Sequence, residues 1–192
     1  MWVRQGVADA LYRASQLLPK GCRFQVWGAW RPLALQQALF DKYVESLRKN
    51  EPELSYEDLR KKAQQFISLP STNPKKPSPH NTGRAVDLTL IGPDGKELDM
   101  GTEFDHFGIE AETTYFEHRL REGAISEQEI QILKNRRLLY SIMITAGFTN
   151  YLDEWWHYDF GNQIWGRIKG QAAIYGRAVP IELAESDEPC RF

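Results

Sequence analysis

The stretch that decides the fold is Ser-Pro-His-Asn-Thr-Gly-Arg-Ala-Val-Asp-Leu-Thr-Leu-Ile, residues 78–91. Its second half, 85–91, alternates in polarity and contains β-branched residues, which predicts a strand. His80 precedes Asp87 by an odd number of residues, so on one continuous strand the two side chains would point to opposite faces. We therefore predict a bend over 81–83, where Gly83 can adopt a positive φ. His80 would then come from a loop and Asp87 from the strand.

A second motif, Asp-Glu-Trp-Trp-His-Tyr at residues 153–158, supplies another histidine and another carboxylate. Together the two motifs contain the ligand types of a catalytic zinc site, and neither contains a cysteine. Three protein ligands, His80, Asp87 and His157, would leave the fourth zinc position for water. The remaining carboxylate, Glu154, is the right type of group to deprotonate that water. The sequence therefore predicts a zinc hydrolase.

Parity, that is, whether the spacing of two residues is odd or even, also constrains the second motif. Glu154 and His157 are separated by an odd number of residues and cannot share a face of one regular strand. If 156–160 is a strand, Glu154 must belong to the turn before it, so we predict an irregularity over 153–155. Trp155 and Trp156 would then wall the site and exclude water.

Ordinary interpretations compete with these roles. A single histidine is more often a core or surface residue than a ligand, and His106 and His118 are interpreted in this way. Asp87 differs because a carboxylate in an apolar strand is costly unless it is paired or binds a metal. Arg31 lies at a predicted corner between a strand and a helix, where a simple salt bridge is as good an interpretation as a catalytic role.

Composition sets the broad class. The chain has 192 residues, 42% of them hydrophobic, and a net charge of −2, so we expect one domain over 1–192 and no nucleic-acid partner. Charges at Arg4 and Asp9 interrupt the N-terminus, and no apolar run is long enough to span a membrane. We expect a cytoplasmic protein without a membrane partner, or a periplasmic one if the N-terminus is incomplete. Cys22 and Cys190 are expected to be plain thiols.

Hydrophobic periodicity and turn signals predict alternating helices and strands, with a hairpin around the Gly-Pro-Asp-Gly turn at 92–95. Ser126 and Glu129 form a capping-box pattern, and Gly147 follows the same helix. This pattern is typical of an α+β fold. The predicted helices cover 3–18, 33–48, 55–67 and 126–146, the predicted strands cover 23–30, 85–91, 96–100 and 152–160, and a proline-rich loop covers 70–79.

The two motifs resemble S-x-H-x-x-G-x-A-x-D, at 78–87, and E-x-W-H, at 154–157, of the zinc D-Ala-D-Ala metallopeptidases. Two further segments, Ala-Trp-Arg-Pro at 29–32 and Asp-Met-Gly-Thr-Glu-Phe-Asp at 99–105, resemble the D-alanyl-D-alanine dipeptidase branch, the vancomycin-resistance type of M15 metallopeptidases. The resemblance implies a small α+β domain with an antiparallel sheet, as in the Hedgehog and D,D-peptidase folds. It also implies that this chain lacks the N-terminal segment that helps to form the pocket in that branch.

The resemblance implies one Zn²⁺ per chain and hydrolysis of D-Ala-D-Ala-type dipeptides in cell-wall metabolism. The alternatives are a peptidoglycan D,D-carboxypeptidase or endopeptidase with the same site and a non-catalytic zinc or peptidoglycan-binding domain. The sequence leaves the oligomeric state open. The implied roles are zinc ligands for His80, Asp87 and His157, base and then acid for Glu154, an oxyanion contact for Arg31, an ammonium contact for Asp105 and a polar contact for Ser78.

Overall fold

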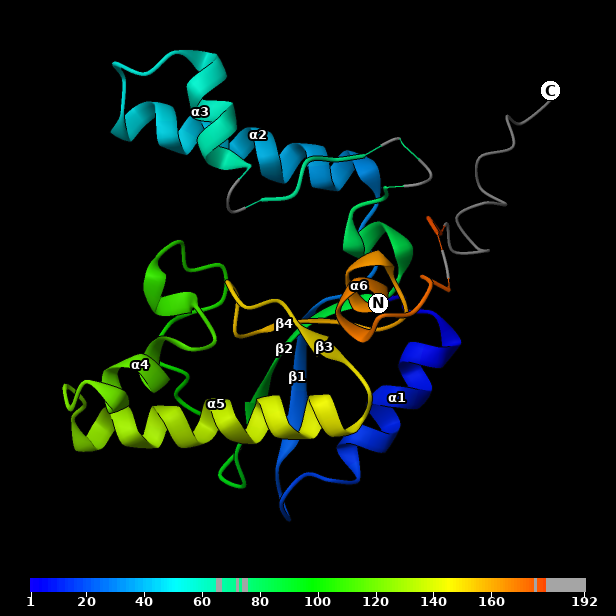
Figure 1. Cartoon of the computed structure of the whole chain (residues 1–192), viewed down its shortest axis with the longest axis vertical. Helices are drawn as coiled ribbons and strands as arrows, with labels where there is room; N and C mark the ends of the chain where they lie inside the picture. The colour runs from blue at the N-terminus through cyan, green and yellow to red at the C-terminus, as the bar shows by residue number, and fades with distance from the viewer. Residues whose placement is uncertain (65–66, 72, 74–75, 175, 179–192) are drawn as a thin grey trace.

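The computed structural model describes residues 1–64, 67–71, 73, 76–174 and 176–178. Its centre is a four-stranded antiparallel sheet in the order β1-β2-β4-β3 (Figure 1). Across the described ranges, every helix is too short or too polar to cross a membrane. The strands are β1 (Arg23–Gly28), β2 (Ala85–Ile91), β3 (Thr149–Asn150) and β4 (His157–Asp159).

Strand β2 organises the sheet because all seven of its residues are buried. Val86, Leu88 and Leu90 belong to the main hydrophobic core. Asp87 and Thr89 lie on the opposite face, as the period of two in a strand requires. The polar face of β2 is therefore the one available to build a site.

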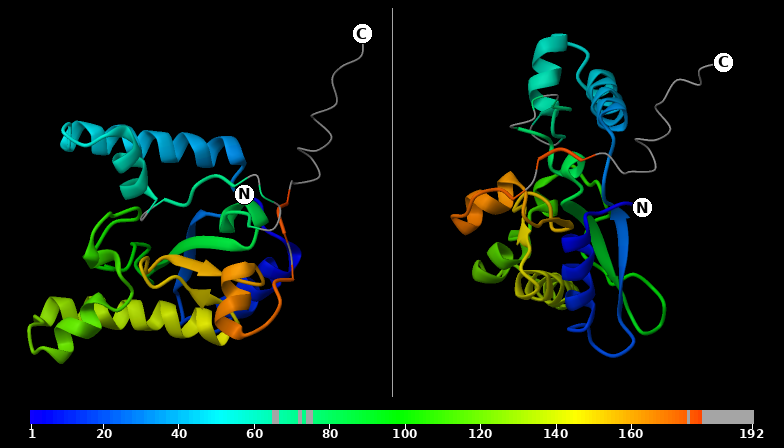
Figure 2. Two further views of the ribbon diagram at one scale, coloured as in Figure 1. Left: turned by 45° about the horizontal axis from the view of Figure 1, so that its top comes forward. Right: turned by 90° about the vertical axis from the view of Figure 1, so that its right-hand side faces the viewer.

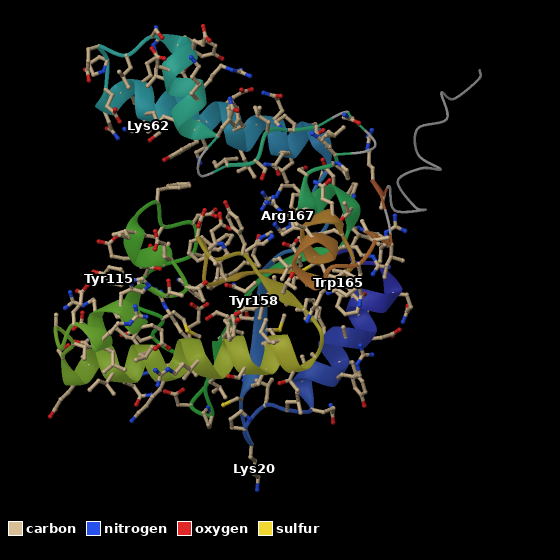
Figure 3. All side chains as sticks on the ribbon, in the orientation of Figure 1. Lys20, Lys62, Tyr115, Tyr158, Trp165 and Arg167 are labelled. Atoms are coloured by element: carbon tan, nitrogen blue, oxygen red, sulfur yellow. The ribbon has the colours of Figure 1, made fainter. Side chains whose placement is uncertain are left out.

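Helices α1 (Gln5–Ser15) and α5 (Glu127–Thr145) supply the other half of the main core. Both helices lie along one side of the sheet in Figure 1. Helix α5 begins with the predicted capping box, and Gly147 after its end has a φ of 99°. Tyr158 of β4, labelled in Figure 3, is 1% exposed and belongs to this core.

Helices α2 (Leu33–Asn50) and α3 (Tyr56–Ala63) form an arm with its own hydrophobic cluster. Both views in Figure 2 show this arm projecting from the sheet on the side away from α5. Ser55 caps α3 by accepting a hydrogen bond from the Asp58 amide, as its sequence predicts. The ring of Tyr43 stacks on Phe107 with 4.2 Å between centroids, so the arm contacts the loop that follows β2.

Four short helical elements lie between or after the larger ones, and only the first, η1, falls where the sequence predicted a bend. Helices α4 and α6 have only seven residues each, too few for a strong periodic pattern. Asn162 caps α6 by accepting from the amides of Ile164 and Trp165. These elements are η1 (Pro79–Thr82), η2 (Ile109–Ala111), α4 (Tyr115–Arg121) and α6 (Gln163–Lys169).

The α+β class is confirmed, whereas two predicted strands are wrong in extent. The strand expected over 152–160 is limited to β4, because 152–156 forms turns. The return strand expected over 96–100 is reduced to one bridge between Ile91 and Glu97 and a hydrogen bond from the Leu98 amide to the Leu90 carbonyl, because residues 98–100 do not continue along β2. Residues 65–66 of the predicted third helix, part of the 70–79 loop and Cys190 lie outside the described residues.

Candidate active site

Three buried side chains converge at the polar face of the sheet. The Nε2 atom of His80 lies 3.2 Å from Asp87 Oδ2, and the Nδ1 atom of His157 lies 3.0 Å from Asp87 Oδ1. One ligand atom from each residue can be chosen so that all three lie within 4.8 Å of one another. Burial disfavours the charged form of Asp87, but the two histidines outweigh it and hold the pKa of this carboxyl well below its usual range.

His80 reaches the site from the predicted bend. Residues Pro79–Thr82 form the short helix η1, which ends at Gly83 with a φ of 66°. Ser78 fixes this turn because its hydroxyl donates to Asn81 Oδ1 at 2.6 Å. The side-chain amide of Asn81 in turn donates to the carbonyl of Arg31. The bend thus joins the His80 turn to the corner after β1.

The ring nitrogens that face away from the convergence point also have partners. His80 Nδ1 lies 2.7 Å from the carbonyl oxygen of Ala29, so it carries a proton and leaves the Nε2 lone pair free. His157 Nε2 lies 3.3 Å from the fully buried Asp159 carboxylate. Burial lowers the pKa of His157, but the Asp159 and Asp87 carboxylates outweigh this and raise it. Both rings are thereby oriented.

Gly28 makes room for the Asp87 carboxylate. It ends β1, where the register shifts between Val26 and Gly28, and it pairs with Asp87 across the strands. A Cβ atom at this position would overlap Asp87 Oδ2 and lie 3.0 Å from its Cγ. Any larger residue would therefore displace the carboxylate.

Glu154 lies in the turn before β4, as parity predicts. Its Oε2 is 3.9 Å from His157 Nδ1, and its side chain is 24% exposed. Burial raises the pKa of Glu154 to about 7; His157 and Arg31 oppose this rise, whereas the Asp87 and Asp105 carboxylates add to it. A carboxyl with a pKa near neutral can both accept and release a proton at physiological pH.

Arg31 and Asp105 line the same cavity, which has a volume of about 520 Å³. The Arg31 guanidinium lies 3.5 Å from Asp87 Oδ2 and also donates to Gln36. Asp105 has a φ of 59°, a left-handed conformation that costs energy in a residue other than glycine. Loss of water at the cavity wall and the Asp87 carboxylate raise the pKa of Asp105.

The loop that carries Asp105 is fastened to the core by Arg136 of α5. This side chain is 3% exposed and donates to the backbone carbonyls of Met100, Glu110 and Glu112 at 2.7 to 2.8 Å. Burial lowers its pKa to about 10. The loop is therefore held at both ends by one cation.

The donor set fits a zinc ion. Zinc prefers imidazole nitrogen and carboxylate oxygen, and a catalytic zinc has three protein ligands with one open position. His80 Nε2, Asp87 and His157 Nδ1 are buried, and the rings are held from behind by hydrogen bonds, as metal-ligating histidines usually are. The adjoining cavity leaves space for water and substrate.

All seven residues singled out in the sequence line this cavity, but one expectation needs correction. Trp155 does not wall it: only Trp156 does, while Trp155 turns toward a neighbouring cavity. Asp105 lines the cavity with an exposed side chain. Two interpretations of Arg31 were left open by the sequence, and in the structure its ion-pair partner is Asp87, one of the three converging side chains. His106 is exposed and lies 3.3 Å from Glu110, so it is no ligand.

Three residues of the site were missed in the sequence, although each left a signal. Asp159 follows His157 by two residues, so on a strand both side chains point to the same face of the sheet. Gly28 interrupts an otherwise bulky strand, which often marks a bulge or a close approach. Arg136 is a charge placed within the apolar stripe of α5.

Known proteins with similar sequences identify the family of this chain. Residues 3–173 match the family model Peptidase M15, D-ala-D-ala dipeptidase. A D-alanyl-D-alanine dipeptidase of Synechocystis sp. is 33% identical over 168 residues, which cover 79% of this chain and 68% of that protein. One from Enterococcus faecium is 30% identical over 154 residues, or 79% of this chain and 69% of that protein.

Among solved structures, a vancomycin-resistance D,D-pentapeptidase VanY in complex with Zn(II) is 17% identical, with a TM-score of 0.46 over 86% of this chain and 75% of that one. The family predicted from the motifs is confirmed by the sequence matches. The chain belongs to the peptidase M15 family of D-Ala-D-Ala dipeptidases, and it is a hydrolase.

Proposed function

We propose that this chain hydrolyses unblocked D-Ala-D-Ala-type dipeptides with one zinc ion held by His80, Asp87 and His157. The observation that carries the proposal is the convergence of three buried donors within 4.8 Å beside a carboxyl with a pKa of about 7. A structural metal site would need neither Glu154 nor the adjoining Arg31. A catalytic role therefore accounts for more of the site than a binding role does.

Each side chain has one task in the proposed reaction. A zinc ion held by these three residues would supply a Lewis acid for the peptide carbonyl and would lower the pKa of a bound water toward about 7. Glu154 takes a proton from the attacking water and later delivers it to the departing amine. The guanidinium of Arg31 stabilises the negative charge that develops on the carbonyl oxygen.

Asp105 would bind the free ammonium group of the dipeptide. Its left-handed backbone conformation directs the carboxylate into the cavity at an energetic cost, a feature that clusters at ligand sites. Ser78 is a weaker candidate for substrate contact because its hydroxyl already donates to Asn81. We assign Ser78 to the turn that holds His80.

The second candidate function is a D,D-carboxypeptidase or endopeptidase acting on longer peptides. The exposure of Asp105 favours this second candidate, because an exposed carboxylate stays hydrated and loses little free energy when the substrate has no free ammonium group to pair with it. A dipeptidase should reject N-blocked substrates, whereas the alternative should accept them.

The test is a substrate panel with zinc-loaded protein: D-Ala-D-Ala, L-Ala-L-Ala, N-acetyl-D-Ala-D-Ala and a muropeptide. We expect release of alanine from D-Ala-D-Ala and at least about tenfold lower kcat/KM for the blocked dipeptide, the loss of one charged hydrogen bond. Equal turnover of blocked and free dipeptides would transfer the assignment to the second candidate. No hydrolysis of any of the four would refute both.

A further inference from the structure

Asn150 closes the turn of residues 151–156, which carries Glu154. It ends the short strand β3, pairs with Tyr158 of β4 and is 6% exposed. Its side-chain nitrogen donates to two backbone carbonyls, that of Glu154 at 3.2 Å and that of His157 at 3.0 Å. One buried amide group thus joins the backbone of the proposed base to the backbone of a proposed zinc ligand.

A hydroxyl holds the Asn150 amide in one orientation. The Thr113 hydroxyl donates to Asn150 Oδ1 at 2.7 Å. The side chain of asparagine has one accepting oxygen and one nitrogen with two donors, so a hydroxyl on the oxygen side leaves both N–H groups for the two carbonyls. Asn150 is not among the described residues that line the cavity. Its polar atoms therefore serve the fold around Glu154 rather than a contact with substrate.

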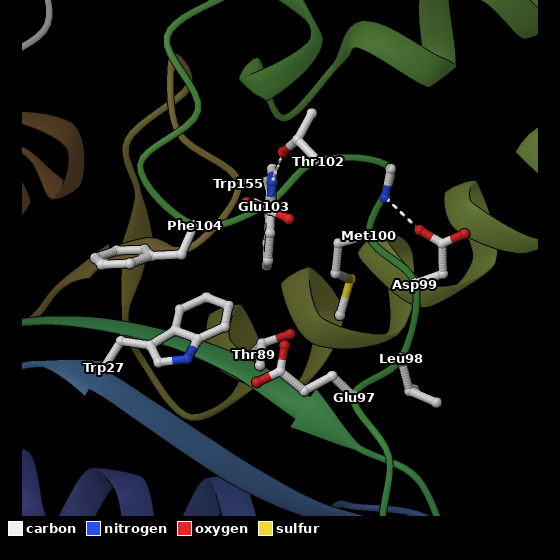
Figure 4. Close-up of a pocket in the computed structure, with 11 residues that line it drawn as sticks. Trp27, Thr89, Glu97, Leu98, Asp99, Met100, Thr102, Glu103, Phe104 and Trp155 are labelled. Atoms are coloured by element: carbon white, nitrogen blue, oxygen red, sulfur yellow. Dashed lines mark hydrogen bonds between the residues drawn. The ribbon is translucent and has the colours of Figure 1, made fainter.

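The peptide group between Glu154 and Trp155 is fixed at both of its polar atoms. Its carbonyl accepts from Asn150, and its N–H donates to the Ala111 carbonyl at 3.0 Å. These two atoms point in opposite directions in a trans peptide, so the plane cannot rotate without breaking a hydrogen bond. The Trp155 ring is also anchored, because its indole N–H donates to Thr102 Oγ1 at 2.8 Å (Figure 4).

His157 depends less on Asn150 than Glu154 does. The His157 carbonyl also accepts from the Tyr151 amide at 3.1 Å. In the sheet His157 pairs with Asp87, and its ring Nδ1 lies 3.0 Å from the Asp87 carboxylate. By contrast, the second donor to the Glu154 carbonyl is the His157 amide at 3.3 Å, a hydrogen bond within the same stretch of chain. Loss of the Asn150 amide should therefore release the turn and leave the metal ligand in place.

We propose that Asn150 is a positioning residue of the reaction, which sets the place of Glu154 relative to the metal ligands. This role rests on the proposed function, because it concerns the residue assigned there as the base. A general base acts only within hydrogen-bond reach of the proton that it takes, and a displacement of about 1 Å can lower a rate about a hundredfold. Thr113 supports the same role by orienting the Asn150 amide.

The test compares Asn150→Leu with Asn135→Leu in the full chain. Leucine resembles asparagine in shape but donates no hydrogen bond. Asn135 is the matched control because it is 7% exposed and its side-chain nitrogen donates to the Asp99 carbonyl at 2.8 Å, outside the Glu154 turn. With saturating zinc, kcat of Asn150→Leu for D-Ala-D-Ala should fall about tenfold or more while KM stays within about threefold.

Zinc affinity, measured by competition with a chromophoric chelator, should stay within about threefold of wild type in Asn150→Leu, because His157 keeps its other contacts. Asn135→Leu should keep kcat within about twofold, because the Glu154 turn is intact. Thr113→Val removes only the orienting hydroxyl and keeps the proposal testable if Asn150→Leu does not fold. It should lower kcat about threefold.

Hydrogen exchange of the metal-free protein gives a readout that needs neither zinc nor hydrolysis. Backbone amides of 151–156 should exchange about tenfold faster in Asn150→Leu than in wild type or Asn135→Leu, the equivalent of one lost hydrogen bond. Unchanged exchange there, wild-type kcat in Asn150→Leu, or a loss of zinc affinity as large as the loss of kcat would overturn the proposal. An inactive wild type would instead refute the proposed function.

Discussion

Replacing Asp159 by asparagine should weaken metal binding although Asp159 is no proposed ligand. Its carboxylate is fully buried, 3.3 Å from His157 Nε2, and it also accepts from the amide of Asn162. The wild-type carboxylate accepts both donors and holds the proton on Nε2, which leaves Nδ1 as the free lone pair. Both donors contact the same oxygen, Oδ1, so the single oxygen of an asparagine could accept both, but it carries no negative charge and would no longer raise the basicity of the His157 ring as a ligand.

The expected magnitude follows from this arrangement. Loss of a residue that orients a metal-ligating histidine typically lowers metal affinity about 10- to 100-fold, which corresponds to about 1.4–2.7 kcal/mol. The measurement is a zinc competition titration against a chromophoric chelator at neutral pH. Glu53→Gln removes an exposed carboxylate far from the site and is the matched control. Zinc affinity of a folded Asp159→Asn protein within about twofold of wild type would refute the reasoning.

Three further predictions concern the same cavity. Gly28→Ala should weaken zinc binding in the same titration, because its Cβ overlaps the Asp87 carboxylate; an unchanged affinity would show that Asp87 can bind from another position. Arg31→Gln should retain one zinc while kcat falls on the order of a hundred- to a thousandfold, whereas a change in KM alone would assign Arg31 to ground-state binding. The pKa of Glu154 is raised from an ordinary 4.5 to about 7. Ionisation of Glu154 should therefore lower the free energy of unfolding of the metal-free protein as the pH rises from 4.5 to 7. Glutamine at this position does not ionise. After allowance for partial exposure, the free energy of unfolding of metal-free Glu154→Gln, measured with urea, should rise by about 2 kcal/mol relative to that of the wild type between pH 4.5 and 7.5. Parallel pH profiles of the two proteins would contradict this.

Parity predicted the parts of the site that depend on local geometry. The odd spacing of His80 and Asp87 required a bend, and the structure has one in η1 and Gly83. The same reasoning placed Glu154 in a turn before β4. These predictions succeeded because strand side chains alternate regardless of what packs against them.

Features that depend on tertiary contacts were not predictable in the same way. The return strand after 92–95 was expected from its turn signal, but the chain follows β2 only as far as the bridge at Glu97, and residues 98–100 form no strand. The direction of Trp155 depends on its hydrogen bond to Thr102, a residue far away in sequence. The three carbonyls held by Arg136 likewise become neighbours only in the folded chain.

The most direct test of the proposed function is a zinc titration of metal-free protein followed by hydrolysis of D-Ala-D-Ala, performed on the wild type and on Glu154→Ala. We expect wild-type activity to rise linearly and to level off at one zinc per chain. Glu154→Ala should bind one zinc and show no hydrolysis above background. Activity in the metal-free wild type, or an active Glu154→Ala protein, would contradict a zinc peptidase that uses Glu154 as its base.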